Sequence, residues 1–303
     1  MADASQKTPK RDAGRTFRRF RSIFLFGVIA IVAAIGALSA IPPMQADRLM
    51  IGLERQFRLA LYGVGATLPG TPDLAQLDAR LSAKGLKLGA PVFMRVFKRE
   101  FLLELWIKKG QRFEHFATYP ICKWSGALGP KLATGDRQSP EGVYTVGKSQ
   151  LNPNSRWYRS FNLGFPNAYD QAHDRTGSFL MVHGGCGSIG CYAMTNAVIG
   201  EIWEIVTKAL DGGQPRFQVQ VFPFRMTDAN LARYAGHRWE PFWRSLKPAH
   251  DLFEADRLPP VASVCNRAYE FRSGTGQREV TAPIATACPA SRNRTTAPAS
   301  TGS

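Results

Sequence analysis

The segment from Ile23 to Ile41 constrains this chain more than any other part of its sequence. Its nineteen residues carry no charge, and a helix needs about 20 apolar residues to cross a bilayer. Residues 1–22 hold seven basic and two acidic side chains, so the positive-inside rule keeps this basic N-terminus in the cytoplasm. We therefore predict that residues 23–41 are a transmembrane anchor or a signal peptide, and that the rest of the chain is exported.

The length of this segment favours the anchor, because the apolar region of a signal peptide is usually about 7–15 residues. Cleavage after Ala40 is the alternative, since Leu38-Ser39-Ala40 fits the small-residue rule only loosely. The chain has 39 basic and 23 acidic residues and a net charge of +16. A basic surface favours an anionic partner, and export excludes nucleic acid as that partner.

The pattern beyond residue 41 predicts an α+β architecture. A four-residue apolar repeat indicates a helical neck over 42–88, and aromatic and β-branched runs near 91–121 indicate strands. We place a β-rich catalytic domain at 89–223. Residues 224–272 look like a helical C-terminal extension, and residues 273–303 have the composition of a disordered tail.

Two elements of the β-rich domain have clear patterns. An apolar stripe from Val198 to Ala209 predicts a helix that stops at Asp211-Gly212. Residues 217–221 alternate apolar residues with Gln218 and Gln220, which predicts a strand with one face in water.

The most informative motif runs from His183, at the end of a strand-like run, to Cys191, eight residues later. The glycines between them let the backbone fold back, so that imidazole and thiol can meet. An imidazole that takes the thiol proton makes the sulfur a nucleophile. Backbone N–H groups around Gly190, Cys191 and Tyr192 are placed to form an oxyanion hole. The motif predicts acyl transfer through a thioester.

A zinc site or a structural disulfide would use the same residue types. His183, Cys186 and Cys191 would supply three zinc ligands, with Cys122 or His173 as the fourth. No paired C-x2-C ribbon accompanies them, but the residues alone leave this alternative open.

The loop resembles the signature of the L,D-transpeptidase (YkuD-type) catalytic domain, in which His-Gly and a glycine-rich spacer precede S-x-G-C. The matching residues here are His183-Gly184 and Ser188-Ile189-Gly190-Cys191-Tyr192. Ser139-Pro140-x-Gly142 matches a second element of that family. The text around Cys122, Gly135 and Phe161 is most similar to the YafK-like branch of murein L,D-transpeptidases. The resemblance covers roughly residues 80–270.

The resemblance implies a periplasmic enzyme, with no metal or other cofactor, that acts on peptidoglycan stem peptides in cell-wall organisation and cell shape. Cys191 would be the nucleophile and His183 the general base. The loop and oxyanion residues would be Gly184, Ser188, Gly190 and Tyr192. The thiol would attack the carbonyl at the L-centre of meso-diaminopimelate, release D-alanine, and pass the acyl group to a diaminopimelate or lipoprotein amine.

Two other functions stay open. Water as the acceptor would make the chain a hydrolase of L,D or lipoprotein–peptidoglycan bonds. A non-catalytic wall-binding protein would instead hold Cys191 in a disulfide. A reversible Cys186–Cys191 bond would switch an enzyme off.

Two positions depart from the wider family. Ile189 stands where many members have a second histidine, which leaves His183 as the only candidate base. Ala193 stands where many members have an arginine, so the substrate of the wider family need not be the substrate here. The YafK-like branch generally shares both changes.

Five polar or aromatic residues are candidates for substrate contact: Arg137, Lys123, Trp124, Tyr158 and Asn162. Arg137 is the strongest, because a guanidinium suits a stem-peptide carboxylate. Four cysteines remain when Cys191 is set aside, which allows three pairings. We expect Cys122–Cys186 and Cys265–Cys288. The group that orients His183 is not evident from the sequence, although a backbone carbonyl would serve.

Overall fold

The computed structural model describes residues 43–274 and 283–288. The basic N-terminus 1–22 and the uncharged segment 23–41 lie outside these ranges. Among the helices of the described part, none is long and apolar enough to cross a membrane. The chain divides into two compact units, Met1–Met50 and Ile51–Ser303. The described part of the first unit is the beginning of helix α2 (Pro43–Gly63), and the site lies in the second.

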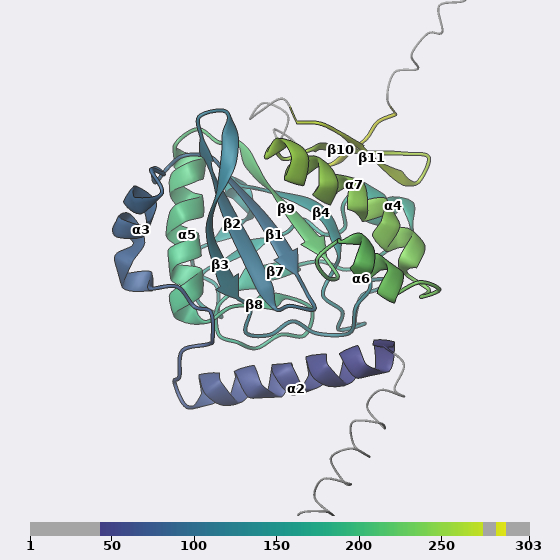
Figure 1. Ribbon diagram of the computed structural model, residues 1–303, viewed down its shortest axis with the longest axis horizontal. Coiled ribbons are helices and arrows are strands. Elements are labelled where there is room, and N and C mark those ends of the chain that lie inside the picture. Colours follow the sequence, from purple (N-terminus) through teal and green to yellow (C-terminus); the bar gives the residue numbers. More distant parts are fainter. Residues whose placement is uncertain (1–42, 275–282, 289–303) are drawn as a thin grey trace, which may run out of the picture. The chain divides into compact units, whose positions relative to one another are not determined.

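A five-stranded mixed sheet forms the centre of the second unit (Figure 1). Its strands are β1 (Val92–Phe97), β2 (Leu102–Lys109), β3 (Arg112–Pro120), β4 (Gly142–Gly147) and β9 (Arg216–Phe222). They lie in the order β3-β2-β1-β9-β4. The β1–β9 pair is parallel and the other neighbours are antiparallel. Strands β1, β2 and β3 lie in the region near 91–121 where the sequence predicts strands, and β2 and β3 form a hairpin.

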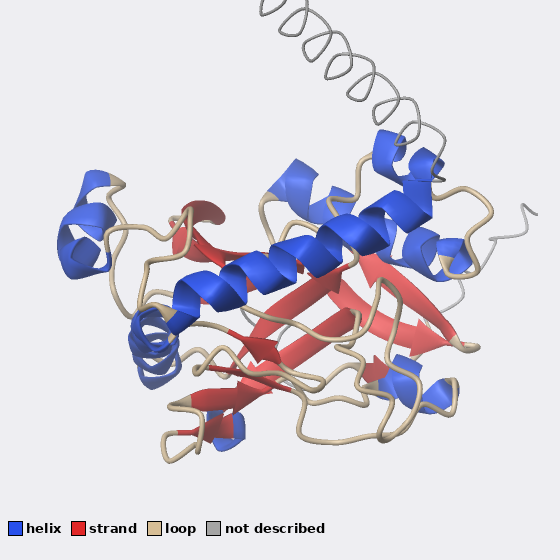
Figure 2. Ribbon diagram, turned by 90° about the horizontal axis from the view of Figure 1, so that it is seen from below, coloured by secondary structure: helices blue, strands red, loops and turns tan. Residues whose placement is uncertain are grey.

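The helices beyond the neck are α4 (Ala168–Ala172), α5 (Asn196–Asp211), α6 (Asp228–Arg233) and α7 (Glu240–Asp256). Alternation along β1 builds a core on each face of the sheet. Val92, Met94 and Val96 pack with the apolar stripe of α5. Phe93 and Phe97 point the other way and join clusters that include α7. Figure 1 shows α5 and α7 on opposite sides of the central strands, and Figure 2 shows the same strands surrounded by helices in a second view. The mixed sheets and helices agree with the α+β prediction.

A second, four-stranded sheet positions the histidine–cysteine loop. It contains β5 (Leu151–Asn152), β6 (Ser160–Asn162), β7 (Met181–His183) and β8 (Tyr192–Ala193), in that order. The short 3-10 helix η2 (Lys148–Gln150) precedes it. The segment between β4 and β7 has little periodicity in sequence because its elements are only two to five residues long.

Two arginines of the neck helices contact the rest of the second unit. The 3-10 helix η1 (Leu74–Gln76) and helix α3 (Leu77–Ala83) follow α2. Arg58 of α2 is 7 % exposed and donates to the carbonyl of Ile121 at 3.1 Å. Arg80 of α3 makes a two-pronged ion pair with Glu201 of α5. These contacts attach α2 to the chain just before Cys122 and α3 to helix α5.

The prediction that β9 has one face in water is wrong. Gln218 and Gln220 are 2 % and 0 % exposed, because α7 and the chain after it cover that face. The amide of Gln218 donates to the carbonyl of Pro260, and that of Gln220 to the carbonyl of Ala249. Hydrogen bonds to backbone carbonyls make these buried amides tolerable.

The helical extension predicted at 224–272 is helical only in part, over α6 and α7. Thr227 caps α6, and Gly236, with a φ of +75°, lies between α6 and α7. The extension then ends in a hairpin of β10 (Val261–Cys265) and β11 (Ala268–Arg272). Its two-residue turn, Asn266-Arg267, has both φ angles positive, as a type I′ turn requires.

The predicted disordered tail, 273–303, contains a fixed strand. Strand β12 (Ala285–Thr286) pairs in parallel with β10, and the predicted disulfide Cys265–Cys288 is present beside it. A disulfide and a strand pairing hold a segment whose composition alone indicates disorder. Residues 275–282 and 289–303 lie outside the described residues.

Candidate active site

The register of β7 and β8 brings His183 and Cys191 to one face. The strands pair in parallel with Val182 opposite Tyr192 and His183 opposite Ala193. One step back, the N–H of Met181 donates to the sulfur of Cys191 at 3.3 Å. Alternate residues of a strand point to the same face. Both side chains therefore line one cavity of about 510 Å³.

The imidazole of His183 is held by the next peptide group. Its Nδ1 donates to the carbonyl of Gly184 at 2.5 Å, which leaves Nε2 as the proton acceptor. The side chain is buried. Burial lowers the pKa of His183, and the Gly184 bond opposes this only in part. The histidine is thus neutral near pH 7 and oriented by a backbone carbonyl.

Cys191 is a half-buried free thiol. Burial raises its pKa, while the N–H of Met181 and the charge of Lys131 pull the pKa down by less. The S–H group points toward the carbonyl of Phe179, 3.6 Å away. The resting pair is therefore a neutral thiol and a neutral imidazole.

The Ser139-Pro140-x-Gly142 motif and the Ser188–Cys191 motif meet at the carbonyl of Cys191. Ser188 Oγ and Ser139 Oγ donate to this oxygen at 2.7 and 3.0 Å. The N–H of Gly190 donates to Ser188 Oγ at 3.2 Å. The hydroxyl of Tyr192, which is fully buried, donates to the carbonyl of Pro140 at 2.6 Å. These bonds fix the backbone that carries the thiol.

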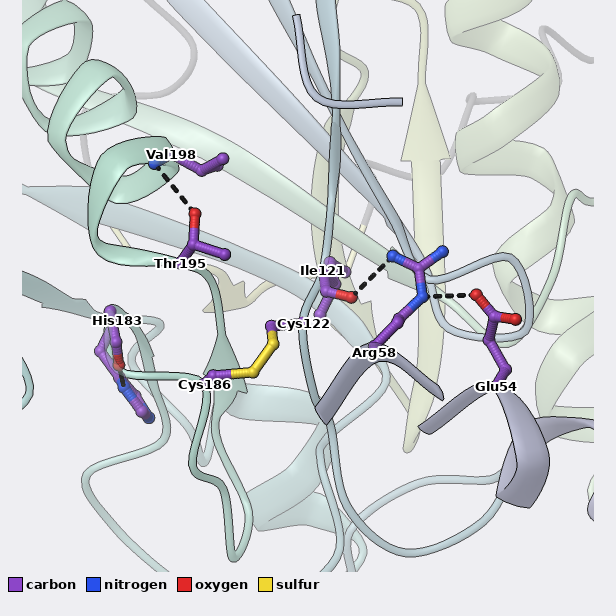
Figure 3. The surroundings of a disulfide bond; sticks show 9 residues. Glu54, Arg58, Ile121, Cys122, His183, Cys186, Thr195 and Val198 are labelled. Atoms are coloured by element: carbon purple, nitrogen blue, oxygen red, sulfur yellow. Dashed lines mark hydrogen bonds and ion pairs between the residues drawn. A yellow bond between two sulfur atoms is a disulfide. The ribbon is translucent and has the colours of Figure 1, made fainter. Parts of the chain in front are cut away.

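The predicted disulfide Cys122–Cys186 is present and anchors the middle of the loop (Figure 3). The N–H groups of Cys122 and Lys123 both donate to the carbonyl of Ala193, so the disulfide closes beside β8. Arg58 binds the carbonyl just before Cys122, and His183 lies on the other side of the loop in Figure 3.

This disulfide and the free thiol of Cys191 argue against three alternatives from the sequence. Cys186 and Cys122 are not thiolates, so the zinc set built on them lacks its ligands. Cys186 is also not the partner of Cys191, which is free. Neither the reversible Cys186–Cys191 bond nor a wall-binding protein with an oxidised Cys191 matches the structure.

The structure brings only one of the five predicted substrate residues into the cavity. Lys123 lines it. Trp124 is 0 % exposed and packs in the core, so it is out of reach of a substrate. Arg137 and Tyr158 are exposed but lie outside the lining, and Asn162 lines a different cavity.

Sequence reasoning missed several residues that do line the cavity. The apolar ones are Trp157, Phe179 and Ile189, which are 43 %, 74 % and 81 % exposed. The polar ones include Arg156 and Ser160. Ser160 Oγ is buried and has no hydrogen-bond partner in the described part of the chain. The basic and aromatic run at 156–159 was a usable signal, and it pointed to Tyr158 instead of its neighbours.

Comparison with known proteins agrees with these motifs. A family model for the L,D-transpeptidase catalytic domain, YkuD, matches residues 93–221. YafK of Escherichia coli (strain K12), whose name assigns it to the L,D-transpeptidases, is 52 % identical over 182 residues, which are 60 % of this chain and 74 % of YafK. YafK of Escherichia coli O157:H7 matches equally well.

The crystal structure of the helical cell shape determining protein Pgp2 from Campylobacter jejuni has a TM-score of 0.37 and 22 % identity over 50 % of this chain and 57 % of that one. A score this low supports no conclusion. The identity to YafK over most of that protein, with the family match across the loop, shows that this chain belongs to the L,D-transpeptidase (YkuD) family.

Proposed function

We propose that this chain is a periplasmic cysteine acyltransferase of peptidoglycan stem peptides, with Cys191 as nucleophile and His183 as general base. One observation carries the proposal. A free thiol and a neutral imidazole, whose Nδ1 is occupied by the Gly184 carbonyl, line the same cavity.

The proposed reaction begins with attack of the Cys191 sulfur on the carbonyl at the L-centre of meso-diaminopimelate. The thiol proton passes to Nε2 of His183. The N–H of Cys191 has no acceptor among the described residues and is the oxyanion donor we favour, because the N–H of Gly190 is occupied by Ser188. Collapse breaks the amide bond, and His183 returns its proton to the leaving amine of D-alanine.

An amine then attacks the thioester, loses a proton to His183, and displaces the Cys191 sulfur, which is reprotonated. The products are a new amide and the free enzyme. Water as the acceptor gives a carboxylic acid instead, by the same steps. The identity of the acceptor therefore distinguishes a transpeptidase from the hydrolase alternative.

The charges of the cavity support an anionic substrate. Lys123 and Arg156 are part of its lining, and none of the lining residues is acidic. Stem peptides carry carboxylates, which pair with ammonium and guanidinium groups. Lys123 pairs with Ala193 in an isolated bridge. Ala193 stands where many family members have an arginine, so Lys123 places a cation next to that position.

The two disulfides support an oxidising compartment such as the periplasm. We propose that residues 23–41 anchor the chain in the inner membrane or direct its secretion. We likewise propose residues 42–88 as a neck, 89–223 as the catalytic domain and 224–272 as an extension.

The test uses the full chain, purified in detergent, with three substrates: a diaminopimelate tetrapeptide muropeptide, a 3–3 cross-linked dimer and a lipoprotein-linked muropeptide. Mass spectrometry reads the products beside a Cys191→Ala control. Loss of D-alanine with a new cross-link supports the transpeptidase. Addition of water to any of the three establishes the hydrolase. No turnover of any substrate would contradict an enzyme of this class.

A further inference from the structure

A second cavity of about 510 Å³ lies apart from the catalytic one. The two share no lining residue. Its walls come from β4, η2, β6, the loop before α4, the start of β9 and the C-terminal segment 283–286. That segment is the one held by β12 and the Cys265–Cys288 disulfide. One wall of the cavity is therefore held in place by a strand pairing and a disulfide, and the cavity has the size of a small-ligand site.

The one charged residue in the lining is Arg216. Its Nε donates to Thr145 Oγ1 at 3.0 Å and its Nη2 donates to the carbonyl of Thr145 at 2.8 Å. Nη2 also donates to the side-chain oxygen of Gln150. These neutral acceptors orient the guanidinium without neutralising it. Its Nη1 makes no hydrogen bond within the described residues.

Three other arginines that point into the protein have carboxylate partners, whereas Arg55 has no ion pair among the described residues and packs its guanidinium over Trp124. Arg80 pairs with Glu201, Arg95 with Glu104 and Arg175 with Asp170. Arg216 is partly buried, has no ion pair in the part of the chain that the structure describes, and its pKa is lowered by burial alone. Nη1 of Arg216 is a charged donor with no partner among the described residues, so a ligand anion would complete this site.

The rest of the lining indicates what that ligand looks like. Asn162 presents an amide NH₂ that makes no hydrogen bond within the described ranges, since only its carbonyl oxygen is used. Pro166, Pro283 and Ile284 supply apolar surface. A single positive charge balances one negative charge, which favours a carboxylate over a phosphate dianion. An amide donor beside aliphatic surface suits a peptide.

We propose that this cavity is a second binding site, which takes the carboxylate of a peptide on Arg216. Nη1 of Arg216 binds the carboxylate, Asn162 binds an adjacent amide oxygen, and the segment 283–286 forms the outer wall. The site does not depend on the proposed acyl transfer, because binding requires neither Cys191 nor His183.

Isothermal titration calorimetry of the full chain in detergent tests this, with N-acetylalanine in its D and L forms as the probe. N-acetylalaninamide, which lacks the charge, is the matched ligand control. We expect the acid to bind and the amide to bind roughly ten- to a hundredfold more weakly, the loss of one charge-assisted hydrogen bond. Equal binding of acid and amide by the parent protein would overturn the proposal without any substitution.

Variants then locate the site. Arg216→Gln should weaken the acid by the same factor, and Arg216→Lys should restore part of the loss. Arg112→Gln, which removes an exposed cation from the β2–β3 hairpin, should have no effect. Lys123→Gln should also leave this affinity unchanged. A loss caused by Lys123→Gln and not by Arg216→Gln would place the ligand in the catalytic cavity and reject the second site.

Discussion

The two cavities have the same volume, about 510 Å³ each, but different chemical groups in their linings. The catalytic cavity contains reacting groups that are neutral at rest, Cys191 and His183. The other contains one charge, Arg216, oriented by neutral oxygens. Both cavities contain cationic side chains, since Lys123 and Arg156 line the first, but only the first also contains a thiol and an imidazole.

The comparison shows that the volume of a cavity indicates little about its function. The reactive and polar groups in its lining that lack a partner indicate more. In the catalytic cavity the unused groups are the Cys191 thiol, Nε2 of His183 and the orphaned hydroxyl of Ser160. In the second cavity the unused group is the charge of Arg216. Each set predicts which changes harm one cavity and spare the other.

Cys191→Ala has the largest expected effect. Turnover of the muropeptide substrates should fall by roughly 10⁴-fold or more, because the covalent route disappears. N-acetylalanine binding at Arg216 should keep its affinity in the same preparation, as calorimetry will show. Residual thioester chemistry in this variant would mean that another residue is the nucleophile.

His183→Gln should lower kcat by roughly 10²- to 10⁴-fold, the usual contribution of a general base. Glutamine keeps a polar side chain of similar reach but accepts no proton. The measurement is single-turnover release of D-alanine, or of whichever product the substrate assay identifies. A variant as fast as the parent would remove His183 from the mechanism.

The pH dependence of kcat/KM should differ from that of ligand binding at Arg216. Burial lowers the pKa of His183 below 6.5, its ordinary value, and raises that of Cys191 above 9.0. The imidazole must be neutral to accept a proton, so kcat/KM should be lost only as the pH falls through the lowered pKa of His183. Binding at Arg216 should stay constant over this acid limb, because a guanidinium keeps its charge. An acid limb above pH 6.5 would contradict the neutral pair.

Ser160→Ala has the smallest expected effect, and it should change stability and kcat/KM in different ways. The hydroxyl has no partner to lose, so stability should stay the same or rise slightly. If the hydroxyl binds substrate, kcat/KM should fall by about fivefold to tenfold. Thermal unfolding and steady-state kinetics measure the two quantities. Loss of stability with unchanged kinetics would show that Ser160 is structural.

Local patterns predicted the elements whose periodicity belongs to one segment. The stripe of α5, the strands near 91–121 and the His183–Cys191 loop are of this kind, and the loop motif was specific enough to indicate the family. The pairing of Cys122 with Cys186 was one of three alternatives in the sequence and is present in the structure.

Features that depend on tertiary partners were predicted less well. The wet face expected for β9 failed because α7 covers Gln218 and Gln220. Trp124 was placed at the substrate although it belongs to the core. Segment 283–288 has a tail's composition, and only its pairing with β10 and Cys265 fixes it. None of these partners is adjacent in sequence.

The Cys122–Cys186 disulfide has a consequence for the maturation of the protein. The chain has five cysteines, and most ways of drawing two disulfides from five would trap the nucleophile. Cys186 is the cysteine nearest to Cys191 in sequence and the one best placed to compete for it during oxidative folding. Its native bond to Cys122 removes that competitor, so correct oxidation of the chain is itself a step in producing an active thiol.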